Sequence, residues 1–163
     1  MGLSLVATLT MLRRLFLRSD NSSLPLAWWA RLLLAALGVA LAVPLVIACL
    51  LVPDPTGKGY GTHEQMGLPP CTFTQTVGIR CPSCGMTTSW TYLVRGRVDR
   101  AVMANSGGTL LAIIALVTAP WAIVTAVRGR LLWGRPSDHA IALGTAVVLV
   151  VTLVDWVIRL AVG

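Results

Sequence analysis

The stretch LLLAALGVALAVPLVIACLLV, residues 32–52, decides the fold of this chain. It holds 21 consecutive residues without a charge. Because a helix rises 1.5 Å per residue, a run of this length covers the hydrocarbon core of a bilayer, which is about 30 Å thick. Pro44 lies inside the run, and membrane helices tolerate such a proline. The sequence therefore predicts a first transmembrane helix over residues 32–52.

Two further apolar runs follow. Residues 106–127 carry no charge, and Gly107 and Gly108 near their start favour close helix contact. Residues 140–160 are predicted as the third span. Asp155 and Arg159 stand four residues apart near its far end, on one helix face, so we expect them to form an ion pair.

The composition agrees with a chain that is solvated mostly by lipid. Hydrophobic residues make up 56% of the 163 residues and charged residues 12%, whereas a soluble domain carries about 25% charged residues. The length suits a single membrane domain. The net charge is +7, but the arginines flank the apolar runs. We therefore expect lipid headgroups as their partners and no nucleic acid.

The basic residues predict an orientation. Residues 1–31 form a basic N-terminal segment, which we expect to lie on the membrane as an amphipathic helix over residues 1–20. Four arginines precede the first span, and three lie in the basic loop 128–139. The positive-inside rule then predicts a cell inner (plasma) membrane protein with a cytoplasmic N-terminus, so residues 53–105 face outward. Arg95, Arg97 and Arg100 are expected to meet lipid phosphate.

Residues 53–105 form a cysteine-rich loop. Its first part, residues 53–80, is polar and shows no helical or strand period, so we expect irregular structure there. The motif CPSCGMT follows at residues 81–87. Apolar residues then recur at helical spacing up to Val94, but the segment from Cys84 would reach only about 16 Å as a helix. The sequence predicts a short interfacial or re-entrant helix after the motif.

The spacing of Cys81 and Cys84 suits a shared metal ion. Pro82 stiffens the turn between them, and Gly85 permits a positive φ. A tetrahedral zinc site needs four ligands. Cys71 supplies a third sulfur and His63 is the nearest histidine. The candidate metal ligands are therefore Cys71, Cys81, Cys84 and His63, with zinc as the cofactor.

Two other interpretations of the motif stay open. A helix N-terminus lowers a thiol pKa, so Cys81 could attack a disulfide and Cys84 could resolve it, as in a membrane thiol-disulfide oxidoreductase. A disulfide could also simply pin the loop. No Ser/His/Asp arrangement, phosphate loop or paired carboxylates point to another enzyme.

The motif, with an upstream cysteine and later Gly96, Ala101 and Asn105, resembles a family of uncharacterised small bacterial membrane proteins that share a Cys-Pro-x-Cys-Gly-x-Thr core. The resemblance covers about residues 71–125 and marks Pro82, Gly85, Thr87 and Asn105 as motif-supporting positions. Thr88 and Ser106 depart from it, since arginine and proline usually stand there. The family has no agreed function, so the resemblance implies membrane location and an important motif.

Together these features predict an all-α integral membrane protein with three transmembrane helices and a short helix after the cysteine-rich loop. We expect a non-enzymatic accessory or assembly subunit whose loop is stapled by zinc or a disulfide. Its expected partners are the lipid bilayer and another membrane protein.

Overall fold

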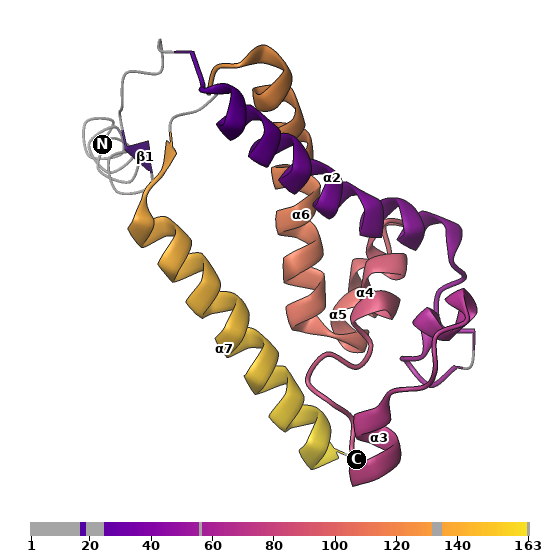
Figure 1. Cartoon of the computed structure of the whole chain (residues 1–163). Helices are drawn as coiled ribbons and strands as arrows, with labels where there is room; N and C mark the ends of the chain where they lie inside the picture. Colours follow the sequence, from indigo (N-terminus) through magenta and orange to yellow (C-terminus); the bar gives the residue numbers. More distant parts are fainter. Residues whose placement is uncertain (1–16, 19–24, 56, 132–134, 163) are drawn as a thin grey trace, which may run out of the picture.

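The computed structural model describes residues 17–18, 25–55, 57–131 and 135–162. Its architecture is helical (Figure 1). A two-residue antiparallel pairing joins β1 (Leu17–Arg18) to β2 (Arg135–Pro136). The helices are α2 (Trp28–Leu50), η1 (Thr62–Met66), α3 (Thr72–Val77), α4 (Met86–Leu93), α5 (Val98–Ala104), α6 (Ser106–Arg128) and α7 (Asp138–Val162).

Three of these helices are long and apolar enough to cross a membrane, namely α2, α6 and α7. The predicted fold class is confirmed: apart from the two-residue pairing of β1 and β2, the regular structure of the described residues is helical, with three spanning-length helices and short helices between the first two. The amphipathic helix expected over residues 1–20 lies outside the described residues, apart from residues 17–18.

The main helix contact joins α2 to α6, which lie side by side in Figure 1. Small residues allow the close approach. A Cβ on Gly38 would lie 2.5 Å from Cγ1 of Ile123 and 3.1 Å from the carbonyl oxygen of Ala119. Without an apolar solvation gain between helices in lipid, such close van der Waals packing is what holds them together.

The short helix α4 packs against this pair. Trp90 is buried in a cluster with Leu45 and Ala48 of α2 and with Ala112 and Ala115 of α6. With eight residues, α4 is about 12 Å long, which is too short to cross a bilayer. The prediction of a short helix after the motif is correct.

Close contacts also form where Gly107 and Gly108 were expected to permit them. A Cβ on Gly107 would lie 2.9 Å from Cα of Thr152 in α7, and one on Gly108 would lie 2.7 Å from Oγ of Ser89 in α4. The first turn of α6 therefore fits between α7 and α4, and it brings both towards the cysteine motif.

Two arginines donate hydrogen bonds to the C-terminal carbonyls of the α2–α6 pair, one at each end of the pair. Arg95 donates from Nη1 to the carbonyl of Ala48 at 3.0 Å, and from Nη2 to those of Cys49 at 3.1 Å and Leu51 at 2.7 Å. Arg31 donates to the carbonyls of residues 126 and 127 at the end of α6. Because helix C-termini carry unpaired carbonyls and a partial negative charge, both contacts are favourable.

Arg95 was expected to meet lipid phosphate, and the structure adds a protein partner that this expectation missed. Its guanidinium is occupied by the C-terminus of α2, more than forty residues away in sequence. The sequence signal, an arginine beside an apolar segment, does not distinguish a lipid phosphate from a helix carbonyl.

Replacing Arg95 with methionine should lower the free energy of unfolding by about 1–2 kcal/mol, because charged hydrogen bonds to several helix carbonyls are lost. Unfolding of the purified protein in mixed micelles, followed by circular dichroism, measures this. The matched control Arg100→Met changes an exposed arginine of α5 and should stay within about 0.5 kcal/mol. Equal effects of the two substitutions would contradict the capping role.

The segment 53–80 is less irregular than its composition indicates, so that prediction is wrong in part. It contains η1 and α3, which are five and six residues long. Left-handed glycines end both helices, with φ 76° at Gly67 and 77° at Gly78. A helix this short shows no apolar period, because one or two turns offer too few positions for a repeat.

Candidate metal centre

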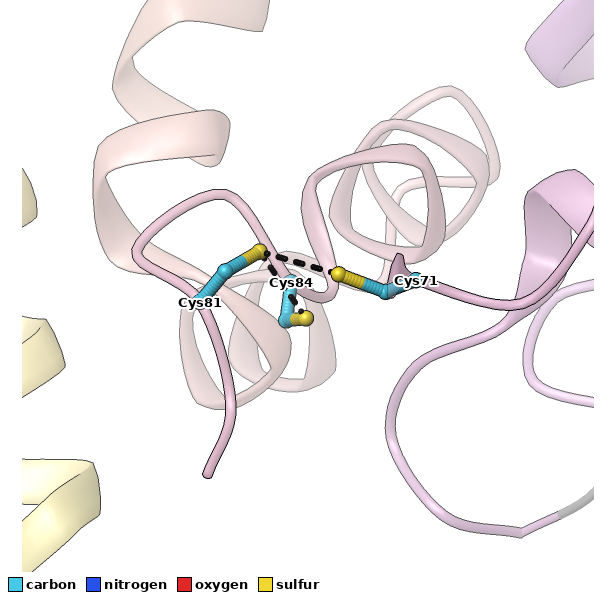
Figure 2. A group of neighbouring side chains, drawn as sticks. All are labelled: Cys71, Cys81 and Cys84. Carbon is cyan, nitrogen blue, oxygen red and sulfur yellow. Dashed lines mark hydrogen bonds between the residues drawn. The ribbon is translucent and has the colours of Figure 1, made fainter. Parts of the chain in front are cut away.

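Three cysteines from two separate segments meet at one point. Cys71 directly precedes α3, whereas Cys81 and Cys84 lie in the turn before α4. The Cys81 sulfur is 3.6 Å from that of Cys71 and 3.1 Å from that of Cys84 (Figure 2). All three sulfurs lie within 4.8 Å of one another, and none of these cysteines is in a disulfide. The trio could hold a metal ion.

The turn from Cys81 to Gly85 is shaped by its backbone. The amide of Cys84 donates to the carbonyl of Cys81 at 3.1 Å, and the amide of Met86 donates to that of Ser83 at 3.0 Å. Gly85 has φ 86°, and a Cβ there would clash with the carbonyl of Ala104. Only glycine fits this left-handed position and close approach, so Gly85 lets the chain turn from the sulfurs into α4.

The environments of the thiols differ. The amide of Thr74 donates to the Cys71 sulfur and, with a further contribution from the Thr74 hydroxyl, lowers the pKa of Cys71 from 9.0 to about 7. Burial raises the pKa of Cys84 to about 11. The redox interpretation assigned the acidic thiol to Cys81, the first cysteine of the pair. The structure gives a lowered pKa to Cys71, which directly precedes a helix.

Alkylation of Cys71 by iodoacetamide in metal-free protein should rise about 10-fold between pH 6 and pH 8, because the thiolate reacts and the pKa lies near 7. Cys84 should stay almost unlabelled over this range. Peptide mass mapping measures both. Thr74→Val keeps the amide but removes the hydroxyl, so it should move the Cys71 profile to higher pH, whereas Thr76→Val on the same helix should not. A flat Cys71 profile would contradict this assignment.

The carbonyl side of the motif is held by Asn105, which is fully buried. Its Nδ2 donates to the carbonyls of Pro82 at 3.0 Å and Cys84 at 3.1 Å. Its Oδ1 accepts from the amide of Gly108 at 2.6 Å and so caps the N-terminus of α6. One side chain thus joins the cysteine turn to the start of a spanning-length helix.

Residues near the C-terminal end of α7 donate hydrogen bonds to the same turn and to the residue before it. Arg159 donates to the carbonyls of Cys84 at 2.8 Å and Pro82 at 3.2 Å, and Trp156 Nε1 donates to the carbonyl of Arg80 at 2.7 Å. The expected ion pair is present, since Asp155 Oδ2 lies 2.7 Å from Arg159 Nη2. The sequence signalled this pair, but it gave no sign that Arg159 and Trp156 also reach the cysteine turn.

A cavity of about 520 Å³ lies on the sulfur side of the turn. Cys71, Cys81 and Cys84 line it together with Thr87 and with the η1 region. His63 also lines the cavity, but it is not part of the group of donor atoms within 4.8 Å of one another. The structure therefore brings together three of the four predicted ligands and leaves the fourth outside that group.

These features define a helical membrane protein with three spanning-length helices and a three-cysteine site at one end. A family model described as a protein of unknown function, DUF2752, matches residues 71–119. The match contains the three cysteines, α3, α4, α5 and residues 106–119 of α6. No curated protein and no solved structure is significantly similar to the chain. No activity is described for that family.

Proposed function

We propose that this protein is a non-enzymatic accessory or assembly subunit of a membrane, and that a zinc ion held by Cys71, Cys81 and Cys84 fixes its loop. The observation that carries the proposal is the meeting of three sulfurs within 4.8 Å of one another. A metal there would join α3 to the turn before α4, two segments that are also in contact through Thr74 Oγ1 and the Cys84 sulfur at 3.6 Å.

The donor set fits zinc. Thiolates favour zinc among the abundant divalent ions, and Zn–S bonds of about 2.3 Å in a tetrahedron place two sulfurs about 3.8 Å apart. The sulfur separations of 3.1 Å and 3.6 Å are close to this value. Small side-chain rotations would therefore be enough to accept the ion.

The exposed apolar surface of α7 supports the assembly role. The apolar window of α7 has no buried residues, and Figure 1 shows α7 apart from α2. Lipid or another membrane protein must cover this helix. The arginine distribution favours a cytoplasmic N-terminus and therefore an outward-facing cysteine site in the plasma membrane.

One observation favours a second function, a thiol-disulfide oxidoreductase. The Cys71 thiol has a pKa of about 7 and lies 3.6 Å from the Cys81 sulfur. Here the Cys71 thiolate would attack a substrate disulfide and release one substrate thiol. Cys81 would then attack the mixed disulfide, releasing the second substrate thiol and leaving a Cys71–Cys81 disulfide. This assignment replaces the predicted pair of Cys81 and Cys84.

Elemental analysis with a thiol count separates the two functions. Protein purified in detergent without added metal should hold about one zinc per chain, and three of its four thiols should react only after a chelator is added. An oxidoreductase would instead contain no metal and would equilibrate with a glutathione redox buffer to form a Cys71–Cys81 disulfide. Recovery of metal-free protein with four freely reacting thiols would refute the zinc proposal.

A further inference from the structure

The three cysteines line a cavity whose other walls are partly polar and partly apolar. Its rim carries exposed Lys58, Glu64 and Gln75, and its floor is formed by buried residues that include Cys84 and Thr88. The volume of about 520 Å³ lies within the range of small-ligand sites, about 300–1,000 Å³. A donor group from outside the chain therefore has both room and access beside the sulfurs.

The opposite side of the cysteine turn is closed. Asn105 and Arg159 both donate to the carbonyls of Pro82 and Cys84. With the backbone side occupied in this way, an ion that binds the three sulfurs meets further donors on the cavity side. The hydroxyls of Ser83, 3.3 Å from the Cys81 sulfur, and Thr74, 3.6 Å from the Cys84 sulfur, lie there, but hydroxyls are not among the usual zinc ligands. The open coordination position of such an ion is therefore directed into the cavity.

His63 is the histidine that lines the cavity, and it lies outside the group formed by the three sulfurs. It belongs to η1, which is anchored on both sides of it. On one side of it, Thr62 is fully buried and its Oγ1 lies 2.8 Å from Oγ1 of Thr88. On the other side, Gln65 accepts from the amide of Val52 at 3.0 Å and donates to its carbonyl at 2.7 Å. Moving His63 toward the sulfurs by shifting η1 would break these hydrogen bonds.

We propose that the three-sulfur site is an open metal site, whose fourth position takes a monodentate imidazole or thiolate donor from outside the chain. The inference rests on the proposed metal binding and goes beyond it. A purely structural zinc site has four protein ligands, whereas a site with three protein ligands keeps a position for an exchangeable one. The incoming donor belongs to a small molecule or to a partner's side chain, and the two share this chemistry.

Cobalt-substituted full-length protein in detergent, prepared under reducing and anaerobic conditions, tests this. Its d–d absorption reports the ligands of the ion directly. Titration with free imidazole should shift the spectrum to saturation. His63→Ala should shift at the same imidazole midpoint, and the matched control His139→Ala, which changes an exposed histidine of α7, should behave likewise. A second titration with acetyl-Gly-His-Gly-amide tests whether a donor on a polypeptide also enters.

The titrations distinguish an open metal site from a site with four protein ligands. A shift of the d–d spectrum with imidazole alone assigns the donor to a small molecule. A shift with the peptide as well shows that a side chain can also bind, and both results support an open site.

Two results would overturn the proposal. In the first, imidazole shifts the spectrum of His63→Ala but not that of the wild type, which makes His63 the fourth ligand. In the second, imidazole shifts neither spectrum. Absence of any thiolate-to-cobalt charge-transfer band would instead reject the metal site itself, and with it the proposed function.

Discussion

Replacing Cys84 with serine is expected to lower the zinc affinity of the purified protein by about 100-fold or more. Structural zinc sites bind with about 10–16 kcal/mol shared among four ligands, so each ligand contributes roughly 3 kcal/mol. Serine keeps the size of the side chain but offers a hydroxyl in place of a soft thiolate. Cys84 is chosen for this test because it is buried and its sulfur lies 3.1 Å from the Cys81 sulfur.

Competition with a chromophoric zinc chelator measures this affinity. The matched control is Cys49→Ser, since Cys49 lies within α2 and outside the sulfur cluster. It should bind zinc like the unchanged protein. Thermal unfolding adds a second readout: zinc should stabilise the unchanged protein and the control, and it should stabilise Cys84→Ser much less. Equal zinc affinity in all three proteins would show that the trio is not the metal site.

Replacing Asn105 with alanine is expected to lower the free energy of unfolding by about 2–4 kcal/mol, among the larger values for one side chain. The substitution removes two hydrogen bonds to the cysteine turn and the cap of α6 at once. Asn105 is fully buried, and its loss leaves the Gly108 amide without its cap, whereas Arg159 still donates to the two carbonyls of the turn. Measurement in the presence of a chelator keeps metal binding out of the comparison.

Asn105→Ser divides the loss into its two parts. A serine oxygen can still cap α6, so this variant should recover about 1 kcal/mol relative to alanine. It lacks the amide donor, so the hydrogen bonds to the turn stay lost. Thr145→Val is the control, because it removes a hydroxyl that bonds only within α7 on an exposed face. A loss as large in Thr145→Val as in Asn105→Ala would mean that Asn105 has no special role.

The candidate site was partly predictable. The short spacing of Cys81 and Cys84 indicated a shared site, because two thiols three residues apart in a turn cannot lie far apart. Cys71 lies ten residues before Cys81, a separation that allows contact with the pair without requiring it. His63 was predicted as the fourth ligand because it is the nearest histidine in sequence. Its place in the structure depends on η1, which Thr62 and Gln65 anchor, and no local pattern in the sequence encodes that anchoring.

The contacts that hold the site were not predictable from local pattern. Arg159 and Trp156 reach the cysteine turn across more than seventy residues, and Arg95 reaches the end of α2 across more than forty. An arginine beside an apolar run suits a lipid phosphate and a helix carbonyl equally well. The alternatives differ only in which group is near after the helices have packed.

By itself, the sequence determined that three helices are long enough to cross a bilayer and that a shorter one follows the cysteine motif. Hydrocarbon leaves backbone groups no partner but one another, so apolar run length alone specifies such helices. Only the tertiary structure decided that the three cysteines line a cavity while Asn105 and Arg159 donate to the carbonyls of their turn. That arrangement depends on directional hydrogen bonds between distant segments, and neither composition nor period encodes their direction.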